Sequence, residues 1–221
     1  MTTLMIIGST GLVGRAALDQ ARVDPRVTRI VAPTRRPLAL TDATGHAAAQ
    51  GRSVDNPIVD FAALPLDAPW WDVDAVVCAL GTTRRQAGSA EAFRKVDFDH
   101  VLAVASAAHA HGARTFVLTS SVGADPGSRF LYFRTKGEIE GAIAALGFAS
   151  FTAVRPAGLT GERPSARRLE QISNGLARAL SFLLPRRYRV VSAERVAKTL
   201  LAAALEAPPG HHVIPSEAIA T

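Results

Sequence analysis

Short apolar segments alternate with longer amphipathic segments along most of this 221-residue chain. The short segments are rich in β-branched residues and have the length of buried strands. We predict strands at residues 4–7, 28–32, 75–79, 115–118 and 151–154, with weaker strand patterns at 56–61 and 211–214. Because the strongest strands are continuously apolar, they indicate a parallel sheet that helices cover on both faces.

The longer segments have the periodicity of amphipathic helices, which we predict at residues 12–22, 90–110, 131–146, 166–184 and 193–206. The segment from Pro33 to Pro57 is interpreted as a partly irregular loop, and the alternation of strand and helix weakens after about residue 156. The pattern therefore predicts an α/β fold with a Rossmann-type doubly wound parallel sheet. We expect a single domain of residues 1–221, in which about 157–192 form a small C-terminal helical cap on the substrate side.

The composition agrees with a globular protein. Hydrophobic residues make up 48% of the chain and charged residues 20%, which excludes a disordered chain. Lysine and arginine outnumber aspartate and glutamate by 25 to 19, which gives a net charge of +6. The arginines are spread along the chain, without a basic tail or an interleaved aromatic platform. We therefore expect a small-molecule substrate as the partner rather than a nucleic acid.

The single cysteine, Cys78, cannot form an internal disulfide, which favours a reducing compartment and predicts a cytoplasmic location. No uncharged apolar run approaches the roughly 18 residues of a membrane span, and the N-terminus lacks a basic leader. His109 and His111 face different ways on a predicted helix, and His211 and His212 have no acidic or cysteine partner nearby. We predict no metal site.

A glycine-rich loop joins the first predicted strand to the first predicted helix. Its sequence is Gly8-Ser9-Thr10-Gly11-Leu12-Val13-Gly14. In such a loop the first glycine permits a tight turn, the second lets backbone amides approach a pyrophosphate, and the third allows the helix to pack closely on the strand. The phosphates then lie at the N-terminus of the helix, where free N–H groups and the dipole favour anions. The loop predicts a dinucleotide site, and a purely structural turn is the alternative.

The end of the second predicted strand discriminates between the two nicotinamide dinucleotides. An NAD site usually has Asp or Glu about twenty residues past the last glycine, to hold the ribose 2′-hydroxyl, whereas an NADP site has arginine for the 2′-phosphate. This chain has Arg35 and Arg36 there, with no acid before Asp42. Arg15, directly after Gly14, can reach the same phosphate. The sequence favours NADP(H) and leaves NAD(H) as the alternative.

Tyr132 and Lys136 are four residues apart in a predicted helix and share one of its faces. A nearby ammonium group favours the phenolate form of a tyrosine, which makes Tyr132 a usable proton donor or acceptor. Ser120 and Ser121 follow a predicted strand at its carboxyl end, where ligands of this architecture bind, and either hydroxyl can polarise a substrate carbonyl. The simpler alternative makes the tyrosine a core anchor, the lysine a solvated charge and the serines a helix cap.

The glycine loop, the serine pair and the Tyr/Lys pair, in this order, resemble the motifs of short-chain dehydrogenases/reductases of the atypical, extended type. A narrower resemblance, to the small Tat-interacting-protein-type oxidoreductases and their bacterial relatives, is carried by two segments. These are CALGTTRRQAG at residues 78–88 and SSVGADPGSRFLYFRTKGEIE at residues 120–140. The match covers roughly residues 4–160. It implies an NADP(H) site that also includes Leu80, Gly81 and Thr82 after the fourth strand. The backbone of Arg155 and Pro156, after the sixth strand, is expected close to the nicotinamide, with Leu159 beside it.

The resemblance implies hydride transfer between NADP(H) and a small carbonyl-type substrate by a Tyr/Lys/Ser mechanism. The animal relatives suggest an alternative, an NADP(H)-binding redox sensor or regulatory scaffold with little or no catalysis. Extended relatives often have Asn on the fourth helix where this chain has Asp97, a departure that bears on any Asn-dependent proton relay. They can also dimerise through helices on the sheet faces, so a homodimer is one expectation for the assembly.

Overall fold

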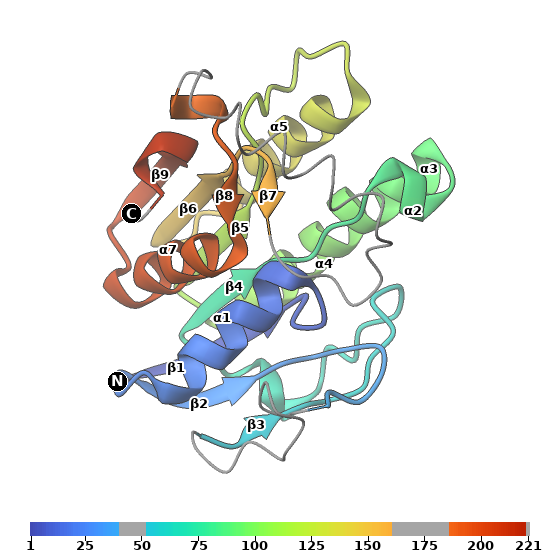
Figure 1. Cartoon of the computed structure of the whole chain (residues 1–221). Helices are drawn as coiled ribbons and strands as arrows, with labels where there is room; N and C mark the ends of the chain where they lie inside the picture. Colours follow the sequence, from blue (N-terminus) through green and yellow to red (C-terminus); the bar gives the residue numbers. More distant parts are fainter. Residues whose placement is uncertain (40–51, 161–185, 220–221) are drawn as a thin grey trace.

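One parallel β-sheet forms the centre of the computed structural model, which describes residues 1–39, 52–160 and 186–219 (Figure 1). The seven strands lie in the order β3-β2-β1-β4-β5-β6-β9, and each neighbouring pair is parallel. Their bounds are Thr2–Ile7 (β1), Val27–Val31 (β2), Val54–Asp55 (β3), Ala75–Cys78 (β4), Thr115–Thr119 (β5), Ser150–Arg155 (β6) and Gly210–Pro215 (β9). The predicted Rossmann-type sheet is confirmed.

The third strand differs from the prediction of a strand at 56–61. β3 ends at Asp55, and an isolated bridge then joins Thr34 to Ile58. Between them lies Pro57, which accepts a hydrogen bond from Thr34 N but has no N–H to donate. The ladder is therefore interrupted at the proline, and the predicted strand is displaced towards the N-terminus.

Helices cover both faces of the sheet. Their bounds are Leu12–Val23 (α1), Arg84–Ala87 (α2), Ala90–Arg94 (α3), His100–Ala110 (α4), Leu131–Ala144 (α5) and Ala193–Glu206 (α7). Helices α1 and α7 lie side by side on one face, and α4 and α5 pack on the other (Figure 1). Within β1, Leu4 and Ile6 join the core beneath α1 and α7, whereas Met5 and Ile7 join the core beneath α4 and α5. All four side chains are buried, which explains the continuously apolar pattern of this strand.

The predicted helix 90–110 is present as three consecutive pieces. Between α3 and α4 the chain makes a π-helical turn, η2, over Lys95–Asp99. A π turn inserts an extra residue into a helix and so changes the direction of the side chains around it. Asp97 lies within this turn and is buried, with 1% of its surface exposed.

Near the C-terminus a second, two-stranded parallel sheet pairs β7 (Leu159–Thr160) with β8 (Val191–Ser192). Ser192 caps α7 by accepting a hydrogen bond from Arg195 N. Short 3₁₀ turns lie at Pro69–Trp71, Arg186–Tyr188 and Ser216–Ala218. The predicted helix 166–184, and with it most of the predicted cap, falls outside the described residues.

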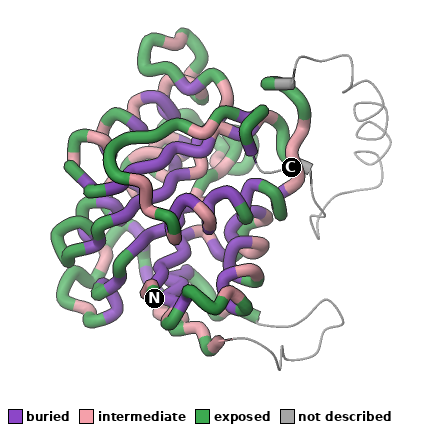
Figure 2. The backbone as a smooth tube through the Cα atoms, turned by 90° about the vertical axis from the view of Figure 1, so that its left-hand side faces the viewer, coloured by how far each residue is buried: buried purple, intermediate pink, exposed green. Residues whose placement is uncertain are grey.

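Buried residues run through the middle of the molecule and exposed residues surround them (Figure 2). None of the helices in the described part of the chain is long and apolar enough to cross a membrane.

Candidate active site

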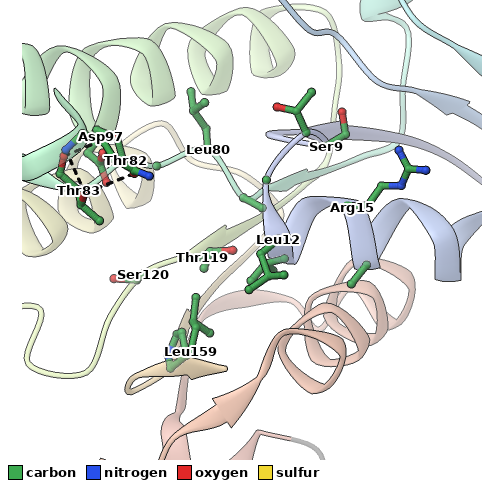
Figure 3. A pocket seen from close by; sticks show the side chains of 18 of the residues that line it. Ser9, Leu12, Arg15, Leu80, Thr82, Thr83, Asp97, Thr119, Ser120 and Leu159 are labelled. Atoms are coloured by element: carbon green, nitrogen blue, oxygen red, sulfur yellow. Dashed lines mark hydrogen bonds between the residues drawn. The ribbon is translucent and has the colours of Figure 1, made fainter. Parts of the chain in front are cut away.

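A cavity of about 1040 Å³ opens at the carboxyl ends of the strands. It lies beside β1 and β4, where the strand order reverses, which is where open α/β sheets bind ligands. Its walls come from the start of α1, from the loops after β2, β4, β5 and β6, and from α5. In Figure 3, Ser9 and Arg15 lie on one side of this cavity, and Thr82 and Asp97 lie on the other.

The glycine loop leaves no room for side chains at two of its three glycines. Gly8 has a φ of +83°, and a Cβ there would lie 2.6 Å from the carbonyl of Ala79. A Cβ at Gly14 would lie 2.2 Å from Gly8 O, and Gly11 N donates a hydrogen bond of 2.8 Å to the same oxygen. The backbone thus forms the tight strand-to-helix turn that the sequence predicts.

The turn also provides the surroundings that a pyrophosphate needs. Ser9, Thr10, Gly11, Leu12 and Val13 all line the cavity at the N-terminus of α1. Ser9 is fully buried, and in the described part of the chain its Oγ has no hydrogen-bond partner. A bare helix N-terminus with an unpaired hydroxyl beside it fits the phosphates of a dinucleotide.

The predicted 2′-phosphate residues lie at the same end of the site. Arg15 lines the cavity, donates from Nη1 to Ala39 O (2.8 Å) and pairs with Asp19 at 3.4 Å. Arg35 and Arg36 are exposed on the turn after β2 and are not among the described lining residues. The three residues that follow them, at 37–39, do line the cavity, so the two arginines lie at its edge.

Tyr132 and Lys136 both line the cavity, and a buried acid pairs with Lys136. Tyr132 is 41% exposed, whereas Lys136 is 4% exposed. Lys136 Nζ lies 2.8 Å from Asp97 Oδ1, and Asp97 Oδ2 accepts a hydrogen bond of 2.7 Å from Thr82 N. A Cβ at Gly81 would come within 3.2 Å of Asp97 Oδ1, so the glycine lets the loop after β4 pass close to this pair.

The charge on Lys136 follows from this contact. Burial by itself lowers the pKa of Lys136, but the negative charge of Asp97, the neighbouring Tyr132 and the hydrogen bond to Asp97 together raise that pKa above its ordinary value. Lys136 therefore remains a cation beside the phenol of Tyr132 at neutral pH.

The two predicted serines differ in their positions. Ser120 lines the cavity, and its Oγ donates a short hydrogen bond to Glu140 Oε1. Glu140 is buried and also accepts from Arg155 Nε (3.0 Å) and Nη2 (2.6 Å), a contact that raises the pKa of Arg155. Ser121 donates to Val122 O (3.1 Å) and is not among the described lining residues.

Most of the other residues that the resemblance implies for the cofactor site line the cavity. Leu80, Gly81, Thr82, Pro156 and Leu159 line the cavity. Arg155, whose backbone is expected beside the nicotinamide, is not among the described lining residues, and its side chain pairs with Glu140. Of the described side chains, no group of three or more His, Cys, Asp or Glu is arranged to hold a metal ion.

The sequence predicts no role for Glu140 and Thr119, and Asp97 stands out in it only as a departure from related proteins. Thr119 lines the cavity, and within the described residues its Oγ1 has no partner. A signal for Glu140 was present, because Tyr132, Lys136 and Glu140 follow one another at four-residue steps on one helix face. Asp97 gave no comparable signal, since its partner Lys136 lies far along the chain.

Comparison with known proteins identifies the family of this chain. A family model described as NAD(P)H-binding matches residues 8–207. The mitochondrial protein fmp52 of Emericella nidulans is 37% identical over 182 residues, which is 81% of this chain and 76% of that protein. The protein HTATIP2 of Rattus norvegicus is 35% identical over 166 residues, covering 75% of this chain and 66% of its own length.

Among solved structures, the UDP-N-acetylglucosamine 4-epimerase from Bacillus cereus superposes with a TM-score of 0.71 at 16% identity, over 97% of this chain and 78% of that one. MoeE5 in complex with UDP-glucose and NAD gives 0.70 at 18% identity, over 96% and 74%. At these identities the likeness shows the fold alone.

The relatives bear on two expectations from the sequence, the location of the protein and its family. The prediction of a cytoplasmic location is contradicted, because the fungal relatives, including the 36% identical protein of Candida albicans, are named mitochondrial. The presence of a single cysteine therefore does not identify the compartment. The family is shown by both the model match and the relatives. The chain belongs to the NAD(P)H-binding family and is a homologue of HTATIP2.

Proposed function

We propose that this protein is an NADPH-dependent reductase of a small carbonyl-type substrate. The observation that carries the proposal is that Tyr132 and the buried, charged Lys136 line one end of the cavity, the proposed catalytic end, while the other end fits a dinucleotide. Tyr132 is the residue in this arrangement that is both open to the cavity and able to donate a proton.

Each residue of the catalytic end has a distinct part in the proposed reaction. NADPH, when bound, supplies the hydride. Tyr132 donates its phenolic proton to the substrate oxygen, and the Lys136 ammonium stabilises the phenolate that remains. Asp97 holds that ammonium in place, and the backbone N–H of Thr82 in turn orients Asp97.

The serine of the proposed mechanism is the one that faces the cavity. Ser120 lines it, but its hydroxyl hydrogen is donated to Glu140. To polarise a substrate carbonyl, Ser120 has to redirect that hydrogen towards the substrate. The hydrogen of Ser121 is likewise donated, to Val122 O. Because both serine hydroxyls already donate their hydrogens within the protein, this arrangement favours the second candidate function, an NADP(H)-binding sensor or scaffold with little catalysis.

The preference for NADPH is supported by charge at the cofactor end. Arg35 and Arg36 follow β2 at the edge of the cavity, in the position where an NAD site would have a carboxylate. Arg15 adds a third guanidinium from the first turn of α1. Guanidinium groups bind phosphates through paired, charge-assisted hydrogen bonds.

The variant Tyr132→Phe tests the reductase. It removes the proton donor and keeps the ring, so we expect NADPH to bind as in the wild type while turnover of any accepted carbonyl falls by at least about a hundredfold. Tyr188→Phe, at an exposed tyrosine outside the cavity lining, is the matched control and should keep full activity. Undiminished turnover in Tyr132→Phe would overturn the role. If the wild type oxidises NADPH with no member of a carbonyl and quinone panel, the sensor is favoured instead.

A further inference from the structure

The side chain of Asn56 holds the turn at residues 34–38 through hydrogen bonds. Asn56 directly follows β3, and its Nδ2 donates hydrogen bonds to Ala32 O (2.6 Å) and to Thr34 Oγ1 (2.8 Å). Its Oδ1 accepts a hydrogen bond from Leu38 N (2.9 Å). The amide thus ties the end of β2 to the far side of the turn through three bonds. A side chain that both donates and accepts is needed to make all of them.

Thr34 connects Asn56 to the backbone of the two arginines through hydrogen bonds. It is buried, with 3% of its surface exposed, and its N–H donates to Pro57 O (3.0 Å). Its Oγ1 accepts from Asn56 and donates to Arg36 O (2.6 Å). The backbone that carries Arg35 and Arg36 is therefore held at its start and middle by a connected set of hydrogen bonds.

The same turn borders the cavity. Pro37, Leu38 and Ala39 line it directly, and Arg15 from α1 donates to Ala39 O. The turn is therefore fastened on two sides, by Asn56 from the sheet and by Arg15 from the helix. Asn56 is not among the described residues that line the cavity.

We propose that Asn56 is a positioning residue that sets the preference for NADPH over NADH, an inference that rests on the proposed function. By holding Thr34 and Leu38, Asn56 keeps Arg35 and Arg36 at the edge of the cavity, ready to bind a phosphate monoester. NADH has no 2′-phosphate, so loosening the turn leaves its affinity nearly unchanged. Pre-organisation of this kind strengthens binding because less conformational freedom is lost when the ligand arrives.

The test measures dissociation constants for NADPH and NADH with the full chain, from the fluorescence of the bound reduced cofactor. Asn56→Ala removes all three bonds, and we expect NADPH to bind about tenfold more weakly while NADH changes less than about twofold. Asn56→Asp has the same shape but loses both donors and adds a negative charge, so we expect about a thirtyfold loss for NADPH. Thr3→Val is the control. It removes two hydrogen bonds of the Thr3 hydroxyl with Asp74 at the opposite end of the sheet, one donated to Oδ2 and one accepted from the backbone N–H, and it should change neither constant.

The measured affinities for NADPH and NADH distinguish a positioning role of Asn56 from the alternatives. Equal losses for NADPH and NADH in the Asn56 variants would show a general structural role and overturn the inference, as would unchanged affinities for both. A wild type without preference overturns it together with the proposed phosphate site. The variant Arg35→Ala/Arg36→Ala separates the two ideas. If that variant keeps the preference, the phosphate site is wrong. If it loses the preference while the Asn56 variants keep it, this inference alone is wrong.

Discussion

The two ends of the cavity are built by opposite means. The cofactor end is formed by backbone, with glycines where a Cβ would lie 2.2–2.6 Å from main-chain atoms. The proposed catalytic end is formed by charged pairs, in which the buried Lys136 pairs with the buried Asp97, and the buried Glu140 pairs with the partly exposed Arg155. Two glycines of the cofactor end have no room for a Cβ, whereas removing one partner of a buried pair at the other end leaves a charge without its counter-charge. The two ends should therefore fail under different substitutions.

The difference follows from what each end has to bind. A pyrophosphate needs N–H groups at close range, and the absence of side chains provides that access. Proton transfer needs a fixed charge at a fixed distance from the phenol, and burial in a low-dielectric interior strengthens such a charge. Buried charges are costly unless they are paired, which explains why Asp97 accompanies Lys136.

The largest expected effect comes from separating the buried pair. Lys136→Met leaves the Asp97 carboxylate buried beside Thr82 N, so we expect the free energy of unfolding to fall by about 3 kcal/mol. Asp97→Asn should cost a similar amount by leaving Lys136 without its counter-charge, and the double variant should cost less than the sum of the two. Urea unfolding of all four proteins measures this coupling. Additive losses would show that Lys136 and Asp97 do not stabilise each other as a buried pair.

A surface pair provides the control for that cycle. Arg29 and Asp55 lie 3.0 Å apart, with side chains 40% and 49% exposed. Because solvent screens such a pair, Asp55→Asn should change the free energy of unfolding by less than about 1 kcal/mol. A loss as large as that of Asp97→Asn would mean that burial does not explain the difference between the two pairs.

An added methyl group at the cofactor end should have the next largest effect. Gly14→Ala would place its Cβ 2.2 Å from Gly8 O, so the turn has to shift. We expect a loss of about 2 kcal/mol in the free energy of unfolding, together with weaker binding of NADPH and NADH alike. Gly141→Ala is the matched control, because a Cβ there meets nothing within 4 Å. In the interior of α5 it should stabilise the protein by about 0.5 kcal/mol. Equal effects of the two variants would contradict the account of the glycine turn.

The cofactor end could be predicted from the sequence more completely than the catalytic end. The glycine loop is a local feature, because its strand, turn and helix occupy consecutive residues. The amphipathic pattern of a helix is also local, and the predicted helix 193–206 has the same bounds in the structure. Tyr132 and Lys136 were found for a similar reason, because one helical step relates them. Every one of these signals depends on neighbours within a few residues.

What could not be predicted depends on contacts across the chain. The π turn at 95–99 interrupts a helix whose apolar pattern is continuous, and it is this turn that contains Asp97. The role of Asn56 requires Leu38, and that of Glu140 requires Arg155, neither of which spacing alone can reveal. The expectation that the resemblance gives for Arg155 concerns its backbone, whereas the pairing of its side chain with Glu140 could not be predicted from spacing.

The smallest expected effect concerns Cys78, the buried last residue of β4. Burial raises the pKa of its thiol from 9.0 to about 11, while Lys136 lowers it and Asp97 raises it by smaller amounts. Between these two values the unfolded chain releases the proton and the folded chain keeps it, so stability must fall as the pH rises. We expect the wild type to lose about 1 kcal/mol relative to Cys78→Ala between about pH 8 and pH 10, as measured by urea unfolding. Parallel pH profiles for the two proteins would mean that the thiol is less buried than the structure shows.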